Sequence, residues 1–117
     1  MYFCLMQNQE LLKGTLKTII LHMLDRHGRM YGYELTQRVR ELSDDYIQIT
    51  EGALYPTLHK LEAEGALVTE KEYIGKRVRK YYKITPGGKS LFKQRMGEFQ
   101  EFMHAMQLVL QLKPKQA

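Results

Sequence analysis

Cysteine is almost missing from this chain of 117 residues, which has only Cys4, and tryptophan is absent altogether. One cysteine cannot form an internal disulfide bond or build a zinc site from cysteines. No stretch approaches the roughly eighteen apolar residues of a membrane span. The first residues, MYFCLM, are apolar but short and lack a basic flank, which argues against a signal peptide. These absences favour a cytoplasmic protein without a membrane partner.

Signatures of catalysis and of metal binding are missing as well. The four histidines fall on separate predicted elements, and no pair has metal-ligand spacing with an acidic third partner: His22, His27, His59 and His104. The sequence has no nucleophile elbow, no phosphate-binding loop and no pair of acids in an apolar setting. We therefore predict no enzyme, no metal site and no cofactor.

Positive charge is the first feature that points to a partner. Eighteen Lys and Arg residues outnumber thirteen Asp and Glu residues, which gives a net charge of +5. Such an excess favours a polyanion as partner, although many basic proteins bind none. With 44% hydrophobic residues, the chain is long and apolar enough for one domain with its own core.

Apolar residues at helical spacing predict three helices in the first half of the chain. The first spans residues 10 to 26 and contains Gly14, which marks a close backbone contact or is simply tolerated. The second spans about 32 to 43. The third begins after Thr50, a good N-cap residue, and stops at Gly65.

After Gly65 the pattern changes to one of β-strands. The segment is rich in Val, Ile, Thr and Tyr, with Gly75 near its middle, and predicts a hairpin with strands at 67–73 and 78–84. Pro86 suits the first position of a last helix that runs to about residue 112. Helices joined by a polar loop and followed by a hairpin are typical of a winged helix-turn-helix.

The predicted fold is therefore mainly α (α+β), a winged helix-turn-helix domain with a long C-terminal dimerisation helix. We assign residues 1–9 to an N-terminal extension, 10–85 to the DNA-binding domain, 86–112 to the dimerisation helix and 113–117 to a tail. The natural start is Met1 or Met6, and the sequence leaves this open.

The third predicted helix has its weakest helix formers on one side. Its buried stripe consists of three leucines at helical spacing: Leu54, Leu58 and Leu61. A rotation of about 100° per residue then places Gly52, Pro56, His59 and Ala63 on the outward face. Small residues there let the helix backbone approach a partner closely, and a DNA major groove about 12 Å wide admits one helix.

Four segments in this order resemble the PadR family of bacterial transcriptional regulators: LLKGTL at 11–16, YGYEL at 31–35, EGALYPTLHKLEAEG at 51–65 and RVRKYYKITPGG at 77–88. The resemblance implies a homodimeric repressor that binds a pseudo-palindromic operator in double-stranded DNA. It also implies that helix 50–64 reads the major groove and that the hairpin tip touches phosphate or the minor groove. The single C-terminal helix is similar to the compact branch of the family. Two departures are Ala66, where relatives carry a bulkier apolar residue, and the short wing YIGKRV, which argues against deep minor-groove insertion.

The candidate DNA-binding residues come from three elements. On the third helix they are Thr50, Glu51, Gly52, Ala53, Pro56, Thr57, His59 and Lys60. On the second helix they are Tyr33, Gln37 and Arg38, although Gln37 is equally well explained as a surface residue and Tyr33 by packing against the third helix. On the wing they are Gly75, Lys76, Arg77, Arg79 and Lys80, whose cations neutralise phosphates. The alternative for the wing is a solvated hairpin whose lysines prevent aggregation. Tyr82 and Ile84 are assigned to the core.

The last predicted helix carries an apolar seam with heptad-like spacing: Phe92, Met96, Phe99, Met103, Met106 and Leu110. Such a seam either docks on its own domain or pairs between subunits, and we predict a homodimer. Met and Phe side chains repack easily around apolar guests, so the seam could bind a small hydrophobic ligand; the alternative is a closed, dry interface.

The alternative function is a winged-helix protein-interaction module that does not bind DNA.

Overall fold

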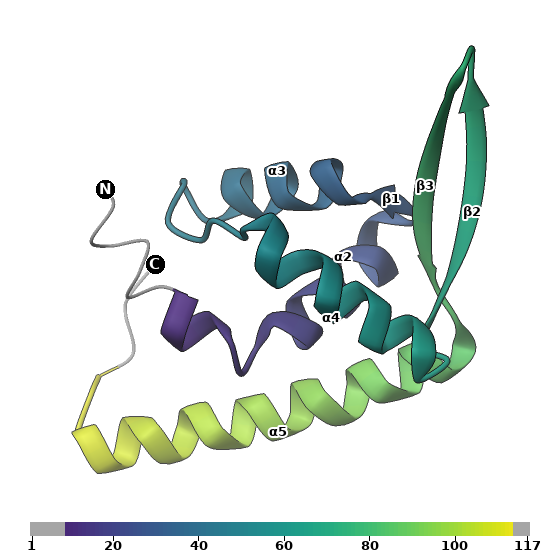
Figure 1. Ribbon diagram of the computed structural model, residues 1–117. Coiled ribbons are helices and arrows are strands. Elements are labelled where there is room, and N and C mark those ends of the chain that lie inside the picture. The colour runs from purple at the N-terminus through teal and green to yellow at the C-terminus, as the bar shows by residue number, and fades with distance from the viewer. Residues whose placement is uncertain (1–8, 114–117) are drawn as a thin grey trace.

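The computed structural model describes residues 9–113, and the start-site question, Cys4 and tail residues 114–117 lie outside this range. In chain order the elements are α2 (Leu16–His27), β1 (Met30–Tyr31), α3 (Gly32–Leu42), α4 (Glu51–Ala63), β2 (Leu67–Ile74), β3 (Arg77–Ile84) and α5 (Pro86–Leu110). The fold is the predicted mainly helical α+β winged helix. In Figure 1 the β2–β3 hairpin projects away from the helices, and α5 runs along the opposite side of the domain.

The first helix is not continuous, so the prediction of one helix over 10–26 is wrong. Residues 9–12 are helical, residues 13–15 form a turn, and α2 begins at Leu16. The backbone N–H and the hydroxyl of Thr15 both donate to the carbonyl oxygen of Leu12, at 2.9 and 3.1 Å. A Cβ at Gly14 would meet nothing within 4 Å, so this glycine marks no close contact. The helix breaks because Gly14 is weak in helices and Thr15 offers a local alternative bond.

The sheet contains one strand that the sequence pattern does not reveal. The strand order is β1-β3-β2, and all pairs are antiparallel. The short strand β1 pairs Met30 with Tyr82 and Tyr31 with Tyr81. The hairpin is one residue longer at its tip than predicted on each side, and Gly75 has φ +64° in its two-residue turn. Glycine adopts positive φ without steric cost, which suits this tight connection.

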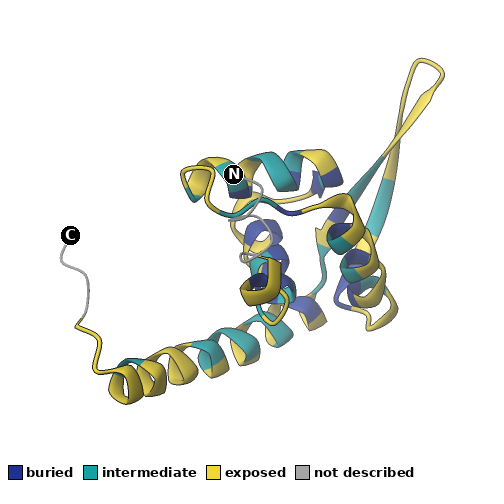
Figure 2. Ribbon diagram, turned by 60° about the vertical axis from the view of Figure 1, so that its left-hand side comes forward, coloured by how far each residue is buried: buried dark blue, intermediate teal, exposed yellow. Residues whose placement is uncertain are grey.

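The core lies between α2, α3, α4 and the base of the sheet. The predicted stripe of α4 is confirmed, since Leu54, Leu58 and Leu61 are completely or almost completely buried. Tyr82 is buried as predicted, and Ile84 packs against the same cluster. Burial raises the pKa of Tyr82 above its usual value. As Figure 2 shows, the wing tip and the far half of α5 remain exposed.

A hydrogen-bonded joint connects the start of α5 to the corner between α4 and β2. The Thr85 hydroxyl donates to the carbonyl of Gly65 at 2.7 Å, and the Thr85 N–H donates to the carbonyl of Ala66 at 3.0 Å. The same hydroxyl accepts from the N–H of Gly88 at 2.9 Å and so caps α5. A Cβ at Gly88 would collide with the Ala66 carbonyl and would lie 2.7 Å from Ile84 Cγ1. The joint therefore requires glycine at position 88.

Replacing Gly88 with alanine should lower the free energy of unfolding by about 1–3 kcal/mol, because the added methyl has no space. Gly97→Ala is the matched control on the same helix, since a Cβ there meets nothing within 4 Å. We expect this control to leave the free energy of unfolding unchanged or to raise it by up to about 1 kcal/mol, because alanine favours a helix more than glycine does. Urea unfolding, followed by circular dichroism, measures the free energy of unfolding of both variants. Equal values for the two would contradict the claim that the joint requires glycine at position 88.

Candidate nucleic-acid interface

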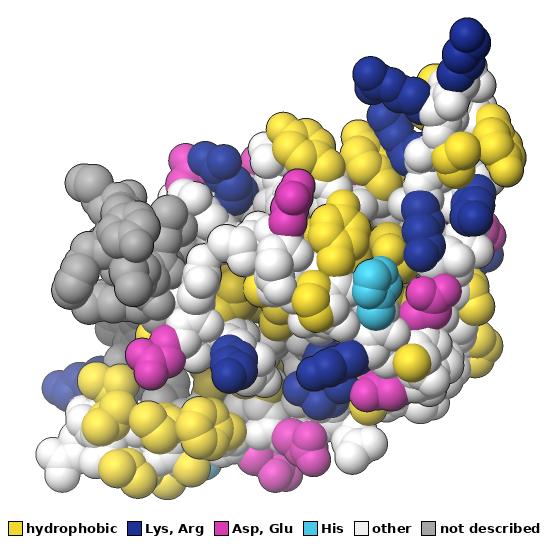
Figure 3. Space-filling model, in the orientation of Figure 1, with side chains coloured by type: hydrophobic (Ala, Val, Ile, Leu, Met, Phe, Trp, Pro, Cys, Tyr) yellow, Lys and Arg dark blue, Asp and Glu magenta, His cyan; other side chains and the backbone are white. Residues whose placement is uncertain are grey.

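A groove of about 400 Å³ lies between the wing, the start of α3 and α4. We call it the wing groove, and its lining residues are Tyr31, Gly32, Tyr33, Tyr55, Ile74, Arg77, Val78, Arg79, Lys80 and Tyr82. Three cations stand on the wing side, and tyrosines from α3 and α4 stand opposite. In Figure 3 the Lys and Arg side chains gather at the tip of the hairpin. Cations and hydroxyl donors around one groove suit the phosphates of a nucleic-acid backbone.

Tyr55 is the α4 residue that borders this groove, and sequence reasoning missed it. Its ring lies against the start of α3, where a Cβ at Gly32 would come within 2.5 Å of Tyr55 Oη. Gly32 thus allows the tyrosine to lie across the helix junction. The signal in the sequence is the position of Tyr55 beside the leucine stripe, on the flank that faces the hairpin. Tyr33 is 65% exposed and borders the same groove rather than packing against α4.

A ladder of alternating charged and aromatic side chains supports the outer face of the wing. Arg29 forms ion pairs with Glu70 at 3.0 Å and Glu72 at 3.1 Å, and its guanidinium lies 4.2 Å from the centre of the Tyr81 ring. The hydrogen bond to Glu72 is the main cause that raises the pKa of Arg29. Tyr81 meets Tyr31 edge to face, with ring centroids 5.6 Å apart. These contacts hold the base of the hairpin against β1.

The ladder ends at Arg79, whose guanidinium lies 4.2 Å from the centre of the Tyr31 ring. Among residues 9–113, Arg79, Arg77 and Lys76 form no ion pair with a carboxylate. Arg29 is therefore a structural cation, whereas the cations closer to the tip keep their charge available for a partner.

The predicted residues of α4 lie on two different parts of the helix. The outward ridge is confirmed, because Gly52, Pro56, His59 and Ala63 are all exposed. Ala53 and Thr57 are half-buried on the flank toward α2, and the Thr57 hydroxyl donates to the Ala53 carbonyl at 2.8 Å. These two side chains are thus less accessible than predicted, because the leucine stripe rotates them inward.

The remaining candidates are Thr50, Glu51 and Lys60 at α4, and Gln37 and Arg38 on α3. The Thr50 hydroxyl caps the helix by accepting from the Ala53 N–H at 3.2 Å, as predicted for an N-cap. Glu51 is exposed beside it, and Lys60 is exposed about two and a half turns further along the helix, on the flank toward α2. Gln37 borders a small hollow together with Thr50, and Arg38 is exposed on α3.

The apolar seam of α5 divides into two halves. Phe92, Met96 and Phe99 are half-buried, and the Phe92 ring lies 5.6 Å from the His22 ring of α2. Arg95 donates to the buried Thr18 hydroxyl of α2 at 3.1 Å. By contrast Met103, Met106 and Leu110 are exposed at the free end. The first half of the seam therefore docks on its own domain, and only the second half is open.

Between residues 9 and 113, no cluster of three or more His, Cys, Asp or Glu side chains could hold a metal ion. No helix in that range has the length and apolar character needed to cross a membrane.

Comparison with known proteins identifies the family. The model of the "Transcriptional regulator PadR-like family" matches residues 20–94. The transcriptional regulator Rv3488 of Mycobacterium tuberculosis is 42% identical over 72 residues, which are 62% of this chain and 63% of that relative. The chain thus matches less than two thirds of that protein. A family of transcriptional regulators agrees with the prediction that the chain is not an enzyme.

Solved structures give the same answer for the fold. A transcriptional regulator from Clostridium thermocellum superposes with a TM-score of 0.76 at 30% identity, covering 91% of this chain and 99% of that one. Bacillus subtilis PadR in complex with operator DNA superposes with a TM-score of 0.62 at 29% identity, covering 69% of this chain and 46% of that one. This chain therefore belongs to the PadR-like family of transcriptional regulators, as its four sequence segments predict.

Proposed function

We propose that the protein is a homodimeric, sequence-specific DNA-binding repressor. The observation that carries this proposal is the wing groove. Three of its cations, Arg77, Arg79 and Lys80, form no ion pair among residues 9–113 and stand opposite Tyr55 of α4. The related PadR of Bacillus subtilis has been crystallised with operator DNA, and its match to this chain supports the same partner. In this proposal α4 enters the major groove and the wing follows the backbone.

The side chains have separate roles in the proposed complex. Lys76, Arg77, Arg79 and Lys80 neutralise phosphates, which gives affinity without sequence information. Base edges are read from the ridge of α4 by His59 and from the edge of that ridge by Lys60, and both side chains are exposed and polar. Tyr33 and Tyr55 border the phosphate path in the wing groove and donate their hydroxyls. Gly52 and Pro56 keep the helix surface low enough for a close approach.

The proposed dimer is formed through the free end of α5. Exposed apolar side chains gather there, as the lower left of Figure 3 shows: Phe102, Met103, Met106, Val109 and Leu110. An apolar patch of this kind usually marks an interface. In this dimer a small hydrophobic ligand between the Met-rich ends would relieve repression. A dry, closed interface is the alternative.

Binding to duplex DNA should depend strongly on salt. If about four to eight phosphates are neutralised, the log–log slope of affinity against salt concentration is roughly −4 to −7. Fluorescence anisotropy with a labelled duplex at increasing salt measures the slope. A flat response would favour the alternative, a winged-helix module that binds a protein instead of DNA.

Replacing both Arg77 and Arg79 with glutamate should weaken binding about equally on a selected operator and on unrelated DNA, because both side chains contact only phosphates. His59→Ala should instead reduce the preference for the operator. Lys93→Glu is the control and should change neither, because Lys93 is an exposed cation of α5, the helix that runs along the opposite side of the domain from the hairpin. A change of sequence preference caused by the wing pair alone would refute these roles.

Replacing Met103 and Leu110 with glutamate should convert the dimer to monomers, because unpaired charges are costly to bury. Both side chains are exposed in the single chain, so its fold should be kept. Gln94→Glu with Ala105→Glu adds the same charge on the other side of α5 and should remain dimeric. Light scattering gives the mass, and circular dichroism checks the fold. If the Met103→Glu/Leu110→Glu variant is still dimeric, the dimer interface does not lie at the free end of α5.

A further inference from the structure

A second hollow, of about 740 Å³, lies on the flank of α4 opposite the wing groove. Its walls come from residues 9–14, the start of α2, α4 and α5, so segments far apart in the chain meet there. We call it the basic hollow, because its lining contains four cations: Lys13, Lys17, Lys60 and Arg95. Its volume is within the range of about 300–1,000 Å³ that small-molecule sites occupy.

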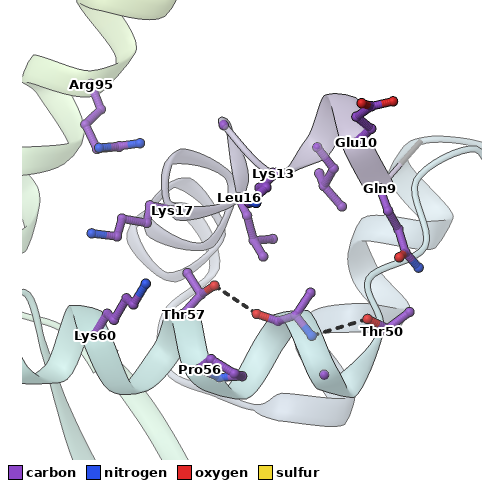
Figure 4. Close-up of a pocket in the computed structure, with 14 residues that line it drawn as sticks. Gln9, Glu10, Lys13, Leu16, Lys17, Thr50, Pro56, Thr57, Lys60 and Arg95 are labelled. Atoms are coloured by element: carbon purple, nitrogen blue, oxygen red, sulfur yellow. Dashed lines mark hydrogen bonds between the residues drawn. The ribbon is translucent and has the colours of Figure 1, made fainter. Parts of the chain in front are cut away.

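The cations of the basic hollow converge from different helices. Figure 4 shows Lys17 of α2, Lys60 of α4 and Arg95 of α5 extending toward the same end of the hollow. Lys17 is paired with Glu64 at 2.8 Å, and Arg95 donates to the neutral Thr18 hydroxyl at 3.1 Å. Within residues 9–113, Lys13 and Lys60 form no ion pair.

The charge balance indicates what kind of anion fits. Glu10 borders the hollow and Glu64 neutralises Lys17, so four cations meet two carboxylates and two positive charges are uncompensated. A phosphate monoester carries a charge of about −1.5 to −2 at neutral pH and offers strong acceptor oxygens. Lysines bind such a group as point charges, and arginine binds it with directed hydrogen bonds.

Beside the charged residues and the polar Gln9, Thr50 and Thr57, the lining contains apolar side chains. Leu12 from the N-terminal segment and Leu16 from the start of α2 line it together with Ala53 and Pro56 of α4. A free inorganic ion would leave this surface uncovered, whereas a ligand with a ring or a short alkyl chain would bury it. Apolar burial adds to the charge attraction and favours an organic ligand over a bare ion.

We propose that the basic hollow binds a small organic phosphate and that the bound ligand weakens DNA binding. The second part rests on the proposed function. Lys60 borders the hollow and is also proposed to contact the DNA bases, so the ligand and the DNA compete for the same side chain. A bound phosphate also stands beside the helix that meets the operator. Charges in about 0.1 M salt act on each other over a screening length of about 10 Å, so the bound phosphate repels the phosphates of the DNA backbone.

Direct binding tests the first part without DNA. The full chain is titrated with phenyl phosphate, with benzenesulfonate as a singly charged ring compound, and with inorganic phosphate, and backbone NMR shifts are followed. We expect phenyl phosphate to bind about tenfold more tightly than either comparison compound, with shifts around Lys13, Ala53 and Thr57. Lys13→Gln and Arg95→Gln should each weaken it about tenfold, and Lys93→Gln should not. Shifts confined to the wing, or equal affinity for all three compounds, would overturn the site.

DNA binding tests the second part. Phenyl phosphate at a concentration that just saturates the wild type should lower operator affinity several-fold in the wild type and in Lys93→Gln. Its effect should be clearly smaller in Lys13→Gln, which binds the ligand about tenfold more weakly. If the ligand binds but operator affinity stays constant, the regulatory coupling is wrong. If Lys13→Gln and Arg95→Gln weaken DNA binding in ligand-free buffer, the cluster belongs to the DNA interface and the proposal fails. A protein that binds phenyl phosphate but no DNA would overturn the proposed function and leave the ligand site intact.

Discussion

Burial of three leucines on one side of α4 determines the rotation of this helix, and both proposed functional surfaces depend on that rotation. Each fully buried leucine contributes about 1.5–3 kcal/mol, so turning the helix about its axis would expose several kcal/mol of apolar surface. With Leu54, Leu58 and Leu61 inside, the ridge that contains Gly52 and Pro56 faces outward. One flank then brings Tyr55 to the wing groove, and the other brings Lys60 to the basic hollow. A single helix thus lies between a proposed DNA surface and a proposed ligand site.

The rest of the structure holds neighbouring elements against α4. On the wing side, Arg29 forms ion pairs with Glu70 and Glu72 and so fixes the base of the hairpin. The cations at the hairpin tip form no ion pair with any residue between 9 and 113. On the other side, the joint at Thr85 fixes where α5 begins relative to the corner after α4. The first half of α5 then docks on α2 through Arg95 and Phe92. The direction of the free end of α5 is therefore set by contacts within one chain.

Much of this architecture could be predicted from local patterns. The leucine stripe, the Thr50 cap and the hairpin after Gly65 depend on neighbours in sequence, and the structure contains all three. The break at residues 13–15 could not be predicted with the same rules, because one glycine costs a helix only about 1 kcal/mol and is often tolerated. Strand β1 has two residues and depends on partners about fifty positions away, so no periodicity reveals it. A heptad-like seam does not show which surface it meets, and here its first half packs against α2 of the same chain.

Selection of bound fragments from a random pool of duplex DNA, using the purified full-length protein, tests the central claim most directly. The claim is that paired copies each present the outward ridge of α4 and the wing to one operator. The account predicts enrichment of an inverted repeat whose half-site centres lie about 34 Å, one helical turn, or a multiple of it apart. Enrichment of a single site without symmetry, or no enrichment at all, would contradict it.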